Sequence, residues 1–383
     1  MSKAIPARVV FAGGGTGGHL FPAIAIADRI MELAGDNMKV DIAFVGTRRG
    51  LEYRLRKSLE YPLHTINVRG LARTITLRNL LVPFILIRAL LQSWLLLRKL
   101  SPDVVVGTGG YVSLPVLTVA AWRKITCVLQ EQNSFPGVST RSLARKASRI
   151  YLGFESARQY LRTDAVVTVT GNPVRRSVLR GDRREALKTF GLNAGKTTIL
   201  ILGGSQGART LNRAVLAALH QDGLPKQYQL LWQTGERDYK EVAASAGRKV
   251  TNCALFPFAR DMNLVYAAAD LAIARAGALT LAELLACGVP SILVPYPYAA
   301  GDHQSKNAAN LVRQGMAKVI MQRQLAELSL LGEAVRLHRS DQWVQMKQAI
   351  ATFNRDRRPA ADVIAEDIIG LIQKKVRGEI GLV

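Results

Sequence analysis

Cysteine is scarce in this chain of 383 residues, which contains only Cys127, Cys253 and Cys287. These residues are far apart and form no Cys-x-x-Cys pair, so the sequence excludes a disulfide framework and a cysteine-based zinc site. Neither an Asp-x-Asp pair nor a His-Glu-x-x-His motif occurs. Because such clusters hold the metal ions that assist phosphate chemistry and hydrolysis, we expect no metal and no cofactor in the site.

The N-terminus lacks the long apolar run of a secretion signal. Residues 1–15, MSKAIPARVVFAGGG, lead directly into a short strand and a glycine-rich turn. We therefore expect a protein that stays in the cytoplasm, a reducing compartment that suits three unpaired thiols.

Acidic residues are outnumbered, with 28 Asp and Glu against 52 Lys and Arg and a formal net charge of +24. Such a balance predicts an anionic partner: nucleic acid, an acidic lipid or a phosphorylated substrate. The chain has no RNP motif, zinc finger or basic zipper, so we expect no nucleic acid partner.

No acidic residue occurs from Tyr61 to Pro102, and much of this segment is apolar. A transmembrane helix needs about 20 apolar residues, and Pro83 and Arg88 interrupt this one. Two interpretations remain: a helix whose apolar side is core, or a helix resting on an anionic membrane with arginines at the lipid phosphates. Both can hold for opposite faces, and we expect the region Arg69–Lys99 to meet an anionic membrane surface.

Glycine is abundant in three turns, GGGTGGH (Gly13–His19), GTGGY (Gly107–Tyr111) and GGSQGAR (Gly203–Arg209). Each turn stands where a predicted strand passes into a predicted helix. Glycine lets the backbone approach a ligand closely, and the N-terminus of a helix attracts phosphate through its amides and its dipole. The three turns therefore predict a cleft lined by phosphate-binding backbone.

Short apolar runs alternate with helical segments, and the alternation restarts at Thr197 after Asn172-Pro173 interrupts regular structure. This pattern predicts an α/β fold of two Rossmann-like domains, each with a parallel sheet facing a central cleft. We expect an N-terminal domain at residues 1–170, a C-terminal domain at 171–355, and a final helix within 356–383 that can pack back on the first domain.

The first turn fits the dinucleotide fingerprint Gly13-x-Gly15-x-x-Gly18. That fingerprint also requires an acidic residue at the end of the second strand, to bind the ribose. The corresponding segment, Val45–Arg49, has no carboxylate. NAD is therefore disfavoured.

The third turn also fits Gly-x-Ser-x-Gly, the nucleophile elbow of α/β-hydrolases, with Ser205 as the nucleophile. Asp270 with His303, or Asp302 with His338, would complete a triad. A serine at such a turn more often binds phosphate or caps the helix. The hydrolase remains the alternative from a different class.

Six motifs together resemble the MurG family of bacterial glycosyltransferases. They occur in order between Val9 and Asn310 and read GGGTGGHLFPAIAIA, GTGGYVSLPV, EQNSFPG, GNPVR, GGSQGAR and ARAGALTLAELLACGVPSILVPYPYAAGDHQSKNA. The resemblance implies the GT-B fold and an inverting, metal-independent transfer of N-acetylglucosamine from UDP-N-acetylglucosamine. The acceptor is the C4 hydroxyl of the muramyl sugar of lipid I, and the product is lipid II for peptidoglycan.

Because that acceptor is linked to undecaprenyl diphosphate, the resemblance also implies a peripheral enzyme at the cytoplasmic face of the bacterial inner membrane. The N-terminal domain would face acceptor and membrane, and the C-terminal domain would bind the UDP-sugar. Another GT-B enzyme that uses a nucleotide sugar, such as a diacylglycerol glycosyltransferase, is the closest alternative.

The resemblance also assigns roles to individual residues. His19 would be the general base, since imidazole ordinarily titrates near neutral pH, or would bind the donor without taking a proton. Gly109, Gly110 and Tyr111 would form an acceptor or phosphate turn. The positions implied in donor binding are Thr16, Gly17, Gly18, Asn133, Arg175, Ser205, Ala259, Ala278, Leu279, Thr280, Leu281, Ala282, Glu283 and Gln304.

Within the donor set, Glu283 would bind the ribose hydroxyls and Gln304 the sugar hydroxyls. Both also have ordinary structural explanations, as a charge favoured by a helix dipole and as a solvated loop residue. The chain departs from the family pattern at Ala259, where isoleucine is common, at Gly301, where an acidic residue is frequent, and at Thr140, where asparagine is frequent.

Overall fold

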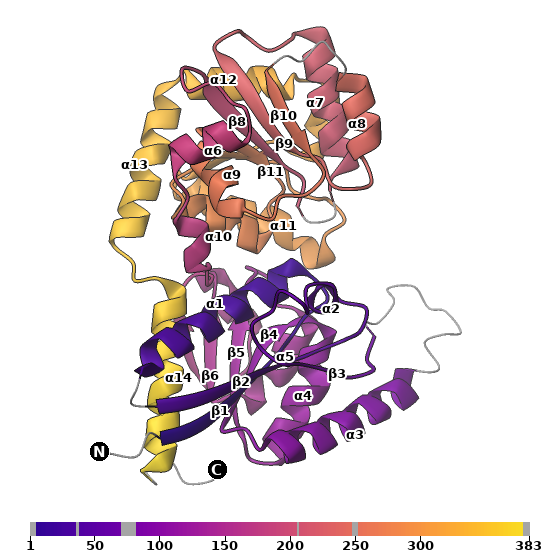
Figure 1. Cartoon of the computed structure of the whole chain (residues 1–383), viewed down its shortest axis with the longest axis vertical. Coiled ribbons are helices and arrows are strands. Elements are labelled where there is room, and N and C mark those ends of the chain that lie inside the picture. The colour runs from indigo at the N-terminus through magenta and orange to yellow at the C-terminus, as the bar shows by residue number, and fades with distance from the viewer. Residues whose placement is uncertain (1–4, 36–37, 70–81, 205–206, 247–251, 378–383) are drawn as a thin grey trace. The chain divides into compact units, whose positions relative to one another are not determined.

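The structure is a computed structural model of the whole chain, and it describes residues 5–35, 38–69, 82–204, 207–246 and 252–377 (Figure 1). Its contacts divide the chain into two units. The first unit is Met1–Arg175 with Pro359–Val383, and the second unit is Arg176–Arg358. We expected domain boundaries at 170/171 and 355/356. The contacts instead divide the two units at 175/176 and 358/359.

The first unit contains a seven-stranded parallel sheet within its described residues, in the order β3-β2-β1-β4-β5-β6-β7. The central strands are buried and rich in valine, isoleucine and phenylalanine, as a sheet covered on both faces requires. The strands are β1 Ile5–Gly13, β2 Met38–Gly46, β3 Leu63–Thr65, β4 Val104–Gly109, β5 Thr126–Glu131, β6 Arg149–Leu152 and β7 Val166–Val169.

Helices cover both faces of this sheet. One core packs α1 and α14 against β1 and β2, and a separate core packs α3, α4 and α5 against the opposite face. The helices are α1 Gly17–Ala34, α2 Leu51–Arg54, α3 Val82–Leu100, α4 Gly110–Trp122, α5 Val138–Leu143 and α14 Ala360–Val376.

The second unit repeats this plan with a six-stranded parallel sheet in its described residues, in the order β10-β9-β8-β11-β12-β13. Its strands are β8 Thr197–Leu202, β9 Tyr228–Gln233, β10 Cys253–Phe256, β11 Leu271–Ala274, β12 Ser291–Leu293 and β13 Ala317–Val319. Its helices are α6 Arg183–Thr189, α7 Arg209–Gln221, α8 Tyr239–Ala246, α9 Met262–Ala268, α10 Ala278–Ala286, α11 His303–Arg313, α12 Leu330–His338 and α13 Asp341–Arg355.

The last helix, α14, belongs to the first unit although the chain reaches it from the second (Figure 1). Its buried face, which includes Ile364 and Ile368, joins the core formed by α1 and the sheet. Asp362 pairs with Arg29 of α1 at 2.9 Å, and the carboxylate of Asp367 accepts the hydroxyl proton of Tyr151 on β6. Apolar burial and these polar contacts together fix the helix against the sheet.

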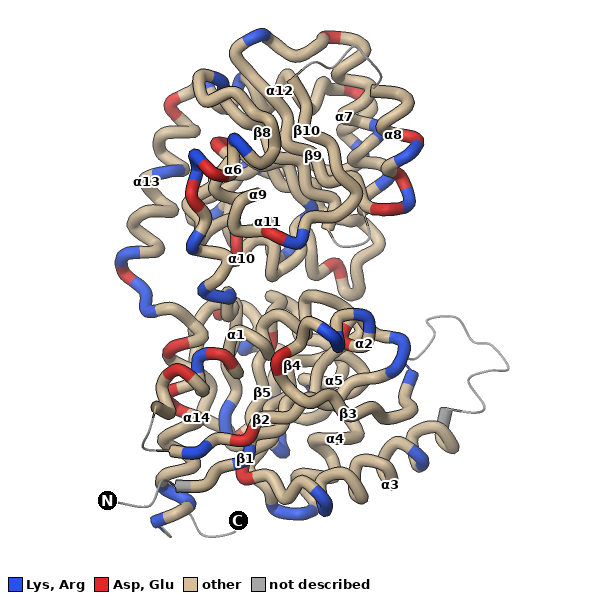
Figure 2. The backbone as a smooth tube through the Cα atoms, in the orientation of Figure 1, with Lys and Arg blue, Asp and Glu red and all other residues tan. Residues whose placement is uncertain are grey.

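Helix α3 has two different apolar faces. Leu97 and Ala89 are buried, whereas Phe84, Leu91 and Leu95 are 71%, 62% and 64% exposed on the opposite side. Figure 2 shows basic and no acidic residues along this helix. Of the described helices, none has both the length and the apolar character needed to cross a bilayer. Part of the region Arg69–Lys99, residues 70–81, lies outside the described residues.

Candidate active site

The first two glycine turns meet at the carboxyl end of the first sheet, between β1 and β4. The chain leaves β1 toward β2 and leaves β4 toward β5, so the strand order reverses between them. Ligands of open α/β sheets bind in the crevice at such a switch point. The turn after β1 contains Gly15 and Thr16 and opens α1, and the turn after β4 contains Gly109 and opens α4.

His19 lies in the first turn of α1, half-buried at this switch point. Its Nδ1 lies 3.0 Å from the carbonyl oxygen of Thr108 and 3.0 Å from Oε1 of Gln132. Because a carbonyl oxygen only accepts, Nδ1 carries the proton and donates it. Nε2 is then the ring nitrogen with a free lone pair, which is the state that a general base requires.

The second turn contacts this imidazole directly. Gly109 has φ of +95°, and a Cβ at this position would lie 2.8 Å from Nδ1 of His19. A Cβ at Gly110 would lie 2.7 Å from the carbonyl oxygen of Gly14 in the first turn. Glycine is required at both positions because the two turns pack against each other with no room for a side chain.

The EQN motif at the end of β5 forms the next wall of this site. Glu131 is buried, and its carboxylate accepts from the amides of Asn133 and Gly137, each at 3.0 Å, and from the hydroxyl of Thr140. Thr140, which stands where asparagine is more frequent in the family, therefore donates a hydrogen bond to the Glu131 carboxylate. Asn172 of the GNPVR motif donates to the carbonyl of Gln132 at 3.0 Å, which joins the two motifs.

The remaining predicted residues of the first unit lie around the same turns. Tyr111 is the second residue of α4, and its hydroxyl lies 3.5 Å from Oγ1 of Thr47. The guanidinium of Arg175 stacks 4.2 Å over the ring of Phe21, a residue of α1. The structure thus brings together nine predicted residues, namely Thr16, Gly17, Gly18, His19, Gly109, Gly110, Tyr111, Asn133 and Arg175.

The third glycine turn occupies the switch point of the second sheet, between β8 and β11. Ser205, predicted to hold phosphate, lies outside the described residues. Gly204 adopts φ of +84°, and its carbonyl accepts from Nε2 of Gln233 at 3.5 Å. The other end of the same amide accepts from the backbone N–H of Ala259 at 3.0 Å. Gln233 thereby joins the third turn to the segment that contains Ala259.

Helix α10 begins at Ala278, beside this turn, with no acidic residue in its first turn and no side-chain cap. The predicted positions Leu279 and Thr280 therefore belong to an N-terminus whose amides and dipole favour an anion. Leu281 is buried, and its N–H donates to the carbonyl of Gly277 at 3.0 Å, so it supports the helix from inside.

Glu283 and Gln304 are held by neighbours within the second unit. Glu283 follows Ala282 in the second turn of α10, is 6% exposed and accepts from the Tyr266 hydroxyl at 2.8 Å. Its position beyond the first turn removes the explanation that the helix dipole alone favours it. Oε1 of Gln304, on α11, accepts from the amide of Tyr296 at 2.9 Å.

Arg275, which directly follows β11, is a buried cation. Its guanidinium donates to the carbonyls of Val294 and Pro295 at 3.1 and 3.2 Å and to Gln322 at 2.7 Å. No carboxylate lies within ion-pair distance of it among the residues that the structure describes. Burial lowers the pKa of Arg275 to about 10, so the side chain stays positive at neutral pH.

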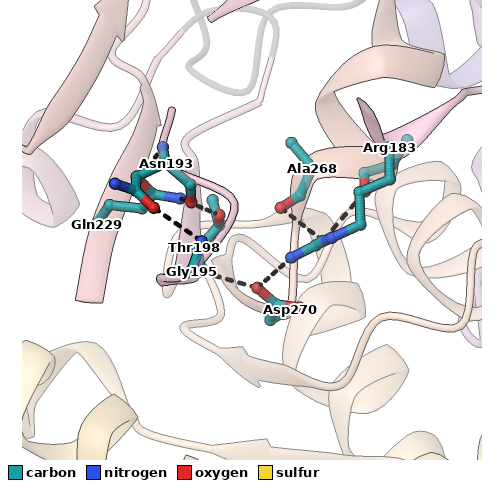
Figure 3. A network of polar contacts seen from close by, with 8 residues as sticks. Arg183, Asn193, Gly195, Thr198, Gln229, Ala268 and Asp270 are labelled. Atoms are coloured by element: carbon teal, nitrogen blue, oxygen red, sulfur yellow. Dashed lines mark hydrogen bonds and ion pairs between the residues drawn. The ribbon is translucent and has the colours of Figure 1, made fainter. Parts of the chain in front are cut away.

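The hydrolase alternative fails on geometry. The carboxylate of Asp270 accepts from Arg183 at 2.9 Å and from the amide of Thr198 at 2.8 Å, at the amino end of β8 (Figure 3). Gly203 and Gly204 follow the carboxyl end of the same six-residue strand, about 20 Å away at the usual rise per residue. His338 also lies at the amino end, where its Nδ1 is 3.2 Å from the hydroxyl of Tyr228. Asp270 and His338 therefore lie at the end of the sheet opposite to Gly203 and Gly204, which argues against both predicted acid–histidine pairs.

Sequence reasoning missed several residues that shape these sites. Gln132 and Arg275 lie inside motifs that the sequence analysis had recognised. A polar residue directly after an apolar strand could have marked each of them as a site residue. Gln233 stands at the end of β9 in the same way. Glu52, described below, gives no such signal because it follows a polar loop. In the described part of the chain, no three His, Cys, Asp or Glu residues are grouped to hold a metal ion.

Comparison with known proteins gives the family. The glycosyltransferase family 28 N-terminal domain matches residues 9–152, and the C-terminal domain of that family matches residues 198–362. The UDP-N-acetylglucosamine--N-acetylmuramyl-(pentapeptide) pyrophosphoryl-undecaprenol N-acetylglucosamine transferase of Chlorobaculum parvum is 43% identical over 343 residues, 87% of this chain and 92% of that protein. Its counterpart in Chlorobaculum tepidum is 41% identical over 370 residues, 95% and 99% of the two chains.

Among solved structures, the MurG crystal structure from Acinetobacter baumannii matches with a TM-score of 0.70 and 29% identity. The match covers 96% of this chain and all of that one. With its two parallel sheets, the chain has the GT-B fold that the sequence predicted. The protein belongs to glycosyltransferase family 28 and, within it, to the MurG family.

Proposed function

We propose that this protein transfers N-acetylglucosamine from UDP-N-acetylglucosamine to the C4 hydroxyl of the muramyl sugar of lipid I, forming lipid II. The observation that carries the proposal is the similarity to enzymes of this name, at 41–43% identity over 87–95% of the chain. The similarity includes both glycosyltransferase domains, so donor and acceptor portions of the enzyme are both present.

His19 is the proposed general base. Its Nδ1–H is held by Thr108 and Gln132, which leaves Nε2 to take the proton of the acceptor hydroxyl as the oxygen attacks C1 of the donor sugar. The bond from C1 to the diphosphate oxygen breaks, and UDP leaves with the electron pair. Attack from the face opposite the leaving group inverts the anomeric centre.

The second unit is the proposed donor site. A departing diphosphate requires stabilisation of its negative charge, and preorganised backbone amides supply it without a metal ion. The third glycine turn follows β8, α10 follows the neighbouring strand β11, and the buried cation Arg275 lies between β11 and α10 in the chain. In this arrangement Glu283 binds the ribose and Gln304 the sugar.

Helix α3 is the proposed membrane contact, and we propose that the enzyme is a peripheral protein at the cytoplasmic face of the bacterial inner membrane. Its outer face presents Phe84, Leu91 and Leu95 together with the exposed side chain of Arg88. Apolar side chains that enter the acyl boundary and cations that meet lipid phosphates are the two contributions that bind a helix in the plane of a membrane.

The decisive experiment uses radiolabelled UDP-N-acetylglucosamine with lipid I in one reaction and diacylglycerol in another. We expect transfer to lipid I, an inverted anomeric configuration and full activity in the presence of EDTA. Transfer to diacylglycerol instead would establish a different GT-B enzyme. Loss of activity in EDTA, restored by magnesium, would refute the metal-independent mechanism.

A further inference from the structure

A buried carboxylate lies behind the first glycine turn. Glu52, from the short helix α2, is 1% exposed. Its Oε2 accepts from the amide of Gly15 at 2.8 Å, and its Oε1 accepts from the amide and the hydroxyl of Thr47 at 2.8 and 3.3 Å. Within the described residues no lysine or arginine pairs with it. Hydrogen bonds from these neutral donors therefore satisfy the charge.

The backbone around this carboxylate has no space for other side chains. A Cβ at Gly14 would lie 2.6 Å from the carboxyl carbon of Glu52, and one at Gly46 would lie 2.4 Å from its Cγ. A Cβ at Gly50 would lie 2.1 Å from both carboxylate oxygens. Glycine at three separate positions thus leaves room for the Glu52 side chain. The surrounding backbone is therefore shaped to hold this carboxylate.

We propose that Glu52 is a positioning residue for the transfer reaction, an inference that rests on the function proposed above. It ties the end of β2, through Thr47, to the amide of Gly15 just before α1 begins. Thr16 follows, and its carbonyl accepts from the amide of His19 at 3.3 Å. The carboxylate therefore sets the start of α1, and with it the place of the His19 imidazole.

The same contact reaches the second turn. The hydroxyl of Thr47 lies 3.5 Å from that of Tyr111, and a Cβ at Gly15 would lie 3.2 Å from the Tyr111 ring. Glu52 thus holds both turns of the first switch point in register. Its two oxygens each face an N–H donor, so an amide in its place would turn an N–H₂ group against one of them.

The test compares Glu52→Gln with the unmodified enzyme in two measurements. Hydrogen exchange should speed up in peptides covering residues 13–20, and kcat should fall about tenfold to 100-fold, as a displacement of about 1 Å in a catalytic group does. KM for UDP-N-acetylglucosamine should change much less than kcat, because most of the residues proposed to bind the donor lie in the second unit. A change confined to stability would leave kcat intact.

Asp367→Asn is the matched control, since Asp367 is a carboxylate of the same unit that holds α14 to β6. It should lower stability without changing kcat or the exchange of residues 13–20. Gly50→Ala provides a second route, because its Cβ would displace the Glu52 carboxylate while the native φ of −79° suits alanine. It should reproduce the effects of Glu52→Gln.

Three results separate the possible failures. Unchanged exchange at residues 13–20 in both Glu52→Gln and Gly50→Ala overturns the positioning role. Unchanged kcat in both variants, with an active unmodified enzyme, overturns the role of Glu52 in transfer. Failure of the unmodified enzyme to transfer N-acetylglucosamine to lipid I overturns the proposed function itself.

Discussion

The two switch points of this protein have similar backbones and different buried charges. At the first, the described residues include two buried carboxylates, Glu52 and Glu131, and Glu52 already occupies the amide of Gly15. At the second, a buried cation, Arg275, accompanies the buried carboxylate of Glu283, and the first turn of α10 has no acidic residue. Since buried charges act strongly over short distances, we infer that the second switch point is the better phosphate site.

The comparison shows that a glycine-rich turn is not by itself a phosphate site. In the first turn, glycine leaves space for a carboxylate of the protein and for the packing of Gly109 and Gly110 against His19 and Gly14. In the third turn, glycine precedes a helix, and among the described residues a buried lysine or arginine occurs only in this unit, as Arg275. We therefore propose proton transfer for the first unit and diphosphate binding for the second.

The largest expected effect comes from His19→Ala, which removes the proposed base from the first switch point. We expect kcat to fall roughly 10²–10⁴-fold, the usual contribution of general base catalysis, while UDP affinity measured by calorimetry stays constant. His220→Ala, on the exposed face of α7, is the control and should retain full activity. A normal kcat in His19→Ala would refute the assignment of proton transfer to the first switch point.

Arg275→Met tests the second switch point. The substitution removes the buried charge and the donor to the carbonyls of Val294 and Pro295. We expect UDP affinity to fall about tenfold to 100-fold, since opposite unit charges about 8 Å apart attract by roughly 2 kcal/mol at an effective dielectric constant of about 20. Arg183→Met is the matched control, because Arg183 pairs with Asp270 at the opposite end of the same sheet (Figure 3). Equal UDP affinity in the two variants would contradict the assignment.

The double substitution Leu91→Ser and Leu95→Ser tests whether the first unit alone meets the membrane. Both side chains are more than 60% exposed, and removing them should weaken binding to vesicles that contain anionic lipid by about tenfold or more, given about 1.5–3 kcal/mol for a fully buried leucine. Val344→Ser, at an exposed position of α13 in the second unit, should bind vesicles normally. Unchanged sedimentation of the double variant would exclude α3 as the contact.

The smallest effect concerns acid stability of the second unit. Burial lowers the pKa of His338 below its usual value of 6.5. The unfolded chain therefore binds this proton first as the pH falls, and the stabilising contribution, present above pH 6.5, decreases below it. We expect urea unfolding, followed through Trp343 beside His338, to lose less stability between pH 8 and pH 5 in His338→Gln. An identical pH dependence in both proteins would refute this.

Much of the fold follows from local pattern. The apolar runs at 197–204 and 228–235 are typical of buried strands and form β8 and β9. The periodic run at 280–288 is typical of a helix and forms most of α10, which ends before Gly288 with φ of +71°. The three-residue strands β3, β12 and β13 are harder to predict, because so few residues carry little periodicity. Of these, β12 lies within the longer apolar run at 289–297.

The site shows a similar division. His19, Gly109 and Asn133 lie in motifs whose residues are consecutive, so the sequence alone could predict them as site residues. Glu52 was missed because its three hydrogen bonds are not visible in the sequence. One joins it to Gly15, 37 residues earlier, and two join it to Thr47, directly after β2. The hydrolase alternative survived at the sequence level because no pattern reveals which end of a strand an acid such as Asp270 faces.

Neighbouring residues alone encode the two Rossmann-like domains, the family resemblance and the turns proposed to bind ligands, because strand periodicity, glycine and helix starts are local features. The folded chain is needed to show which turn amide a carboxylate already occupies and which nitrogen of the His19 ring keeps its lone pair. Those properties depend on hydrogen bonds between residues far apart in the chain, such as Nδ1 of His19 with Thr108 and Gln132. Such bonds exist only after the sheet has brought its strand ends together.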